Sequence, residues 1–202
     1  LAVDLRGHGD SQWITGGAYQ INDFVYDITQ LIEQTKLAPI TIIGHSFGGG
    51  VGLRYAGLYP DKVSKIIAIE GLGFLPKRVK EWQQQPISER LRAWIDDIRK
   101  LSSRLPKRYE TVEQAIVRMQ EANPHLSPEQ AHHLTIHGIN QNEDGTFSWK
   151  FDNYFHSIAP QLNDPKIVFE LWSRITCPTL LIRGNDSWAD DPSKDGRAEH
   201  FN

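Results

Sequence analysis

The chain has almost no cysteine and no long apolar run, and both shortages narrow what it can be. Cys177 is the single cysteine among 202 residues, so neither a disulfide framework nor a thiolate metal cluster is expected. No apolar stretch approaches the roughly 18 residues that a membrane-spanning helix needs. The first residues lack the basic leader and apolar segment of a signal peptide. We therefore expect a cytoplasmic protein with no membrane partner.

The chain also lacks a strong charge of either sign. Its 22 basic and 25 acidic residues give a net charge of −3 and are mixed along the sequence. This distribution provides no basic surface for nucleic acid or for an anionic membrane. Three histidines, His132, His133 and His137, have a spacing that could suit a metal, but no acidic or cysteine partner accompanies them. We expect a solvated helix face there, and neither a metal site nor a cofactor.

What is present is a βαβ rhythm followed by a helical stretch. Short apolar runs predict buried strands at 1–5, 38–43 and 179–182, the second of them buried on both faces, and a further strand at 63–69. Between these strands, apolar residues at helical spacing predict a helix at 21–36, and a run of small residues stopped by Pro60 predicts another at 48–58. Alternating strands and helices of these lengths indicate an α/β fold with a parallel sheet.

Residues 75–172 contain no convincing strand and several helix start signals. Thr111 and Ser127 begin patterns typical of capping boxes, Asp164-Pro165 starts a further helix, and a turn is expected at 142–145. A helical block between two parallel strands is typical of an inserted cap. We therefore predict a first part of the core at 1–74, a mainly helical cap at 75–172, and a second part of the core at 173–202.

One motif carries chemistry. Gly44-His45-Ser46-Phe47-Gly48 has the form G-x-S-x-G at a strand-to-helix junction. A serine at such a sharp turn adopts a strained backbone, and its neighbours two residues away must be small. The turn exposes the Ser46 hydroxyl and directs the Phe47 backbone N–H toward the place where an oxyanion would form. These features predict a nucleophile at Ser46 and an oxyanion donor at Phe47.

Three segments together resemble the α/β-hydrolase superfamily. Residues 4–11 look like its D-x-R-G-H-G-x-S loop, residues 44–49 match its nucleophile elbow, and residues 178–184 resemble the strand after its cap. The resemblance implies a serine hydrolase that cleaves an ester, thioester or related acyl bond through an acyl-enzyme on Ser46. A serine at the elbow argues against relatives that use aspartate there. The aromatic residues of the cap suit a small apolar acyl or aromatic substrate.

The acid that would orient the catalytic histidine has two candidate positions. In most of the superfamily it stands three residues after the glycine that ends the 179–182 strand, and here that residue is Ser187. Asp186 lies one position earlier, and Asp190 and Asp191 follow a little later. Glu70, at the end of the 63–69 strand, is the alternative. A glutamate after an apolar run needs a partner, so we favour Glu70 over Asp186, although it could instead cap the turn that follows it.

No histidine of the chain fits the catalytic base. His8 is expected to bind loop backbone, His45 to point away from Ser46, and His200 to lie on a short helix. The resemblance places the base, a second oxyanion donor and about three leading strands outside this chain. We therefore expect an internal fragment that is inactive alone. The alternative function is a non-catalytic, hydrolase-like protein that binds a small molecule.

Overall fold

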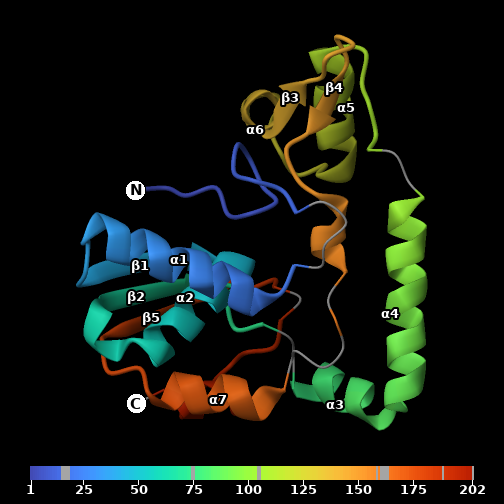
Figure 1. The fold of residues 1–202 in the computed structure, drawn as a ribbon. Coiled ribbons are helices and arrows are strands. Elements are labelled where there is room, and N and C mark those ends of the chain that lie inside the picture. Colours follow the sequence, from blue (N-terminus) through green and yellow to red (C-terminus); the bar gives the residue numbers. More distant parts are fainter. Residues whose placement is uncertain are drawn as a thin grey trace. The chain divides into compact units, whose positions relative to one another are not determined.

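The computed structural model describes residues 1–14, 19–73, 76–103, 106–157, 159, 164–187 and 189–201. Two compact units share the chain (Figure 1). The hairpin unit comprises Leu1–Tyr19 and Ile95–Ile158, and the sheet unit comprises Gln20–Trp94 and Ala159–Asn202. Each unit therefore combines two segments that lie far apart in the sequence.

Three parallel strands form the sheet of the sheet unit, in the order β1 (Ile40–His45), β2 (Val63–Ile69) and β5 (Thr179–Ile182). Their register places His45 beside Ile69, and Ile69 beside Ile182. All three strands thus end at one level. The residues that follow them, Ser46, Glu70 and Arg183, are consequently brought to the same edge, although they are spread over more than half of the chain. The predicted parallel sheet is confirmed.

Helix α2 (Phe47–Leu58) covers one face of this sheet. It contains glycines at 48, 49, 50, 52 and 57, which would weaken an isolated helix by about 1 kcal/mol each relative to alanine. They permit close packing instead. A Cβ at Gly52 would lie 2.8 Å from Ile42, and one at Gly57 would lie 2.2 Å from the Leu171 carbonyl oxygen. Burial of the helix against the sheet, rather than helix propensity, therefore stabilises α2.

The opposite face of the sheet corrects the expectation that the strands at 38–43 and 179–182 are buried. Ile43 is 68% exposed, Leu180 53% and Ile182 42%, and the register places all three on the face away from Ile42 and Ile66. Ile66, by contrast, is only 1% exposed. The apolar composition of these strands predicted burial, but burial requires a covering layer, and α2 contacts only one face.

Two further helices of the sheet unit pack on α2 rather than on the strands. Both α1 (Ile21–Thr35) and α7 (Pro165–Ser173) contact α2. Phe24 of α1 is fully buried, and so are Leu53 and Tyr55 of α2. The unit also contains η1 (Pro60–Lys62), α3 (Pro76–Gln84), the first part of α4 (Ile87–Ser102) and η4 (Arg197–His200). The helices predicted at 21–36, at 48–58 and after Asp164 are confirmed within one residue or two.

The hairpin unit holds α5 (Val112–Ala122), α6 (Pro128–Gly138), β3 (Ile139–Gln141), β4 (Phe147–Trp149) and η2 (Asn153–His156). Thr111 and Ser127 cap α5 and α6 by accepting the backbone N–H groups of Gln114 and Gln130. The turn expected at 142–145 joins β3 and β4, which pair antiparallel. The expectation of no strand at 75–172 is therefore wrong. Strands of three residues are too short to show an alternating pattern.

The N-terminal residues correct a second strand prediction. Leu1–Leu5 form no strand in the structure, and Leu1 is 95% exposed. The loop that follows is ordered by the hairpin unit: His8 forms an isolated antiparallel bridge with Phe151, and the Gly9 N–H donates to the Lys150 carbonyl at 2.7 Å. An apolar run becomes a strand only beside a pairing partner, and no described strand lies alongside residues 1–5.

The compact units divide the chain at other residues than the predicted domains. The divisions fall after Tyr19, Trp94 and Ile158, because the N-terminal loop pairs with the segment around Phe151 and not with the sheet. The domain boundaries predicted at 74 and 172 stay a prediction.

Candidate active site

Ser46 occupies a strained turn between β1 and α2. Its φ of 49° and ψ of −115° lie in a region that side chains rarely adopt, at a cost of about 1–3 kcal/mol. The surrounding backbone holds the turn: the Ser46 N–H donates to the Ile69 carbonyl at 2.7 Å, and the Gly50 N–H donates to the Ser46 carbonyl at 3.2 Å. The residue is exposed. The sharp turn predicted from the motif is present, with the serine open to solvent.

The glycines around Ser46 have different roles from those the motif suggested. A Cβ at Gly44 would lie 2.5 Å from the Gly48 carbonyl oxygen, so Gly44 must be glycine. A Cβ at Gly48 would meet nothing within 4 Å, which makes the expected requirement for a small residue there wrong. The second essential glycine is Gly49, where a Cβ would lie 2.7 Å from the Cα of Gly71. This contact packs the start of α2 directly on the turn that follows Glu70.

Phe47 is the first residue of α2. Its ring packs edge-to-face on Phe24 of α1, with ring centroids 4.8 Å apart, which anchors the turn to the core. Backbone amides in the first turn of a helix point out of its N-terminal end, where the helix dipole is positive. The location suits the predicted oxyanion donor, whose role stays a prediction.

Glu70 follows β2 and reaches across to the loop after β5. Its Oε1 accepts the Gly184 N–H at 2.8 Å, and its Oε2 accepts the Ser187 hydroxyl at 2.9 Å. The Gly184 N–H, aided by the Ser187 hydroxyl and opposed by burial, holds the pKa of Glu70 below its usual value. Glu70 also has a positive φ of 51°. Two of the three described non-glycine residues with positive φ are thus Ser46 and Glu70, in turns that touch each other.

The aspartates after β5 are placed differently. Asp186 is exposed, and its side chain has no hydrogen bond or ion pair within the described residues. Asp191 accepts the Ser193 N–H and hydroxyl, which together lower its pKa. Asp190 is exposed and contributes its backbone carbonyl to Arg197. The structure therefore provides a fixed position for Glu70 and none for the Asp186 carboxylate.

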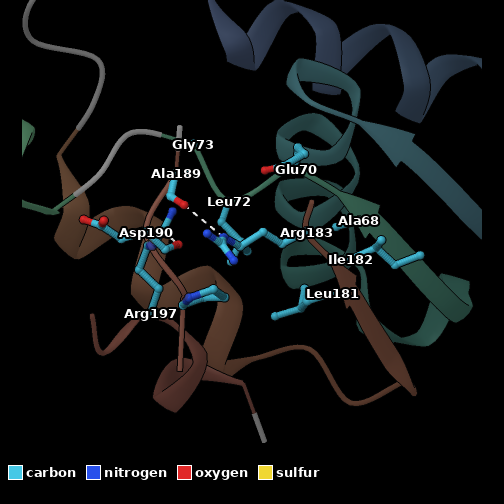
Figure 2. Close-up of a pocket in the computed structure, with 12 residues that line it drawn as sticks. Ala68, Glu70, Leu72, Gly73, Leu181, Ile182, Arg183, Ala189, Asp190 and Arg197 are labelled. Carbon is cyan, nitrogen blue, oxygen red and sulfur yellow. Dashed lines mark hydrogen bonds between the residues drawn. The ribbon is translucent and has the colours of Figure 1, made fainter. Parts of the chain in front are cut away.

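A small cavity lies between Glu70 and the loop after β5. It has a volume of about 40 Å³, enough for a water molecule but far below that of a typical substrate pocket. Its polar lining includes Arg183, whose Nε donates to the Ala189 carbonyl at 2.9 Å (Figure 2). Arg197 is 2% exposed and is paired with Asp195 at 2.7 Å. These contacts give the loop a defined conformation around Glu70.

All eight histidines are described, and none is hydrogen-bonded to Ser46. His8 bonds the Arg6 carbonyl through Nδ1 at 3.0 Å, in agreement with its expected contact with loop backbone. His45 is exposed at the end of β1. His200 stacks on Phe169 of α7, with ring centroids 3.9 Å apart. The chain thus provides the strained Ser46 turn and a fixed carboxylate at Glu70, with no described histidine hydrogen-bonded to Ser46.

His133 and His137 of α6 have their ring centroids 4.6 Å apart, but no described group of three metal-ligating side chains is present. No described helix is both long and apolar enough to cross a membrane. A larger open depression of about 600 Å³ lies in the hairpin unit between Trp13 and Trp149, and none of the candidate catalytic residues lines it.

Comparison with known proteins places the fold. The family described as alpha/beta hydrolase fold matches residues 1–198. A serine hydrolase-like protein of Danio rerio is 30% identical over 149 residues, covering 72% of this chain and 44% of that protein. Serine hydrolase-like protein 2 of Homo sapiens is 27% identical over 157 residues, covering 74% and 49%. The chain thus spans about half the length of these relatives.

Solved structures agree with this placement. The thioesterase domain from the curacin biosynthetic pathway superposes with a TM-score of 0.75 at 24% identity, over 96% of this chain and 67% of that one. A Mycobacterium tuberculosis esterase superposes with a TM-score of 0.71 at 16% identity, over 98% and 61%. Identities at this level show a shared fold.

Proposed function

Because the chain belongs to the alpha/beta hydrolase family, we propose that the full-length protein is a serine hydrolase that forms an acyl-enzyme on Ser46. The observation that carries the proposal is the pairing of two strained turns. Ser46 and Glu70 end neighbouring strands, and Gly49 packs on Gly71 between them. Strain of this kind persists only where the surrounding structure imposes it, and it concentrates at functional sites.

The proposed reaction begins with attack of the Ser46 Oγ on the carbonyl carbon of an ester or thioester. A histidine from outside residues 1–202 takes the hydroxyl proton, and the Glu70 carboxylate orients and stabilises the resulting imidazolium. The Phe47 N–H donates to the oxyanion of the tetrahedral intermediate. Collapse expels the alcohol or thiol, which takes the proton from the histidine. Water then attacks the acyl ester by the same route and regenerates Ser46.

The charge of Glu70 suits this role. The hydrogen bonds from Gly184 and Ser187 keep the pKa of Glu70 below its usual value, so the carboxylate is ionised at neutral pH. Each carboxylate oxygen of Glu70 has two lone pairs and accepts one hydrogen bond here, so it can accept a further donor. The small apolar acyl or aromatic substrate predicted from the sequence forms part of the same proposal.

Covalent labelling tests the nucleophile. In the full-length protein a fluorophosphonate should modify Ser46, and Ser46→Ala should abolish labelling and ester hydrolysis without changing the melting temperature by more than a few degrees. Ser64→Ala, at an exposed serine of β2, is the matched control and should label normally. Labelling that survives Ser46→Ala would contradict the assignment. A wild-type protein that neither labels nor hydrolyses acyl esters, yet binds them, would support the non-catalytic alternative.

Kinetics test the acid. Glu70→Gln should lower kcat by about 1,000-fold or more with little change in KM, since the acid acts mainly on the imidazolium of the transition state. Asp186→Asn should change kcat by less than about 3-fold, because its carboxylate has no fixed position. The opposite ranking of the two variants would show that Asp186 is the acid.

A further inference from the structure

The Glu70 carboxylate connects two strand ends through a single turn. Gly184 and Ser187, the residues that bond its two oxygens, are also bonded to each other, with the Ser187 N–H donating to the Gly184 carbonyl at 3.2 Å. The turn therefore presents one N–H and one hydroxyl to the same carboxylate. Since both donors belong to one closed turn, together they fix the position and the orientation of the carboxylate relative to the loop after β5.

The hydroxyl of Ser187 has a defined direction. The Ala189 N–H donates to Ser187 Oγ at 3.1 Å, so Oγ acts as an acceptor on that side. Its single proton is then directed to Glu70 Oε2 at 2.9 Å. Ser187 thus completes a chain of hydrogen bonds from the loop backbone to the carboxylate, and alanine at this position would break both bonds at once.

We propose that Ser187 is a positioning residue that holds the Glu70 carboxylate where residue 187 would otherwise place its own. The inference rests on the proposed function of Ser46 and Glu70. It makes the two candidate acid positions, at the ends of β2 and of β5, one site in space: the carboxylate comes from β2 and the β5 loop orients it. The serine at position 187 is then a functional residue that orients the acid, and not the remnant of an acid that has been lost.

The first test compares Ser187→Ala with Ser187→Thr in the full-length protein. Loss of the hydroxyl should lower kcat about 10-fold at unchanged KM, because a loosened carboxylate no longer orients the base. Threonine keeps a hydroxyl and should restore most of the kcat. Ser193→Ala is the matched control: Ser193 lies in the same loop and donates to Asp191 at 2.7 Å, so its loss should leave kcat within about 2-fold.

The second readout is the Glu70 carboxyl itself. Its titration can be followed by carbon-13 NMR of protein labelled at glutamate carboxyls, with Glu70→Gln to assign the signal. The Ser187 hydroxyl lowers the pKa of Glu70, so Ser187→Ala should raise this pKa toward the ordinary value of glutamate, and Ser193→Ala should not. Repeating the titration in the Ser46→Ala background separates the two proposals, since it needs no activity.

The third test moves the acid. Ser187 Oγ lies 2.9 Å from Glu70 Oε2, so an aspartate at 187 would bring a carboxylate beside the position where Glu70→Gln has removed the charge. Glu70→Gln combined with Ser187→Asp should regain at least about 10-fold of the kcat that Glu70→Gln loses. If kcat does not rise, the claim that a carboxylate from position 70 and one from position 187 occupy the same site is overturned. An unchanged Glu70 pKa and an unchanged kcat in Ser187→Ala would overturn the positioning role even if Ser46 is the nucleophile.

Discussion

Two adjacent glycines of α2 should respond to alanine with opposite signs. A Cβ at Gly49 would lie 2.7 Å from the Cα of Gly71, whereas a Cβ at Gly48 would have no atom within 4 Å. Carbon atoms in contact are normally about 3.5–4.0 Å apart, so Gly49→Ala creates an overlap of about 1 Å between the new methyl group and the backbone of Gly71. No side-chain rotation can relieve it.

The magnitudes follow from these contacts. Overpacking costs about 1–3 kcal/mol, and an overlap with backbone belongs at the upper end of that range. Alanine in place of glycine returns about 1 kcal/mol of helix propensity. Gly49→Ala should therefore lower the free energy of unfolding by about 2 kcal/mol. Gly48→Ala, which adds no overlap, should raise it by about 1 kcal/mol.

Urea unfolding monitored by circular dichroism measures both variants, with the transition midpoint compared at equal slope. The two substitutions add the same methyl group one residue apart in one helix, so each controls for the other. Equal destabilisation would show that the contact between Gly49 and Gly71 does not limit packing at this turn. Stabilisation by both would show that the turn can widen, and a rigid link between the Ser46 and Glu70 turns would then be refuted.

Three further predictions concern buried polar groups and a helix cap. Tyr19 is 3% exposed and donates to Asp152, and its burial, followed by this bond, raises its pKa from 10.0 to about 12. The unfolded chain therefore loses the phenolic proton at lower pH than the folded chain, so the free energy of unfolding should fall between pH 10.0 and about 12. In alkaline unfolding curves, Tyr19→Phe should reduce this loss. Asp195→Ala leaves the buried Arg197 without its carboxylate and should lower the free energy of unfolding by about 3 kcal/mol or more. Asp97→Ala removes only an exposed pair with Lys100 and should lower it by less than about 1 kcal/mol. Equal losses of stability in thermal unfolding would contradict the burial argument. Ser127→Ala removes the cap of α6 and should lower the unfolding free energy by about 1 kcal/mol, with Ser127→Thr largely neutral; a loss in both variants would point to packing rather than capping.

Features decided by neighbouring residues could be predicted from the sequence. The caps at Thr111 and Ser127 need only residues three positions on. The turn at Ser46 is signalled by a strand, a glycine and a helix in succession, although the Ile69 carbonyl that helps to hold it comes from the neighbouring strand. That Glu70 has a hydrogen-bond partner was also predicted, since a charge after an apolar run requires one. That partner could not be identified, because Gly184 is 114 residues away.

Features decided by distant segments were predicted incorrectly or not at all. Residues 1–5 have the composition of a strand, but pairing is a property of the neighbour as well as of the segment. Gly49 has the same composition as Gly48, and only the approach of Gly71 distinguishes them. Ser187 was interpreted as an acid position without its acid. In the structure it donates to the carboxylate that stands there instead.

The sequence by itself thus determined the sharp turn at Ser46, the α/β alternation and the family, because short-range sterics and hydrophobic periodicity act within a few residues. The tertiary structure alone decided which residues share the edge of the sheet. Parallel strands joined by long crossovers have no local rule for register, and only the pairing of β1, β2 and β5 aligns His45, Ile69 and Ile182. That alignment brings Ser46, Glu70 and the turn from Gly184 to Ser187 to one edge.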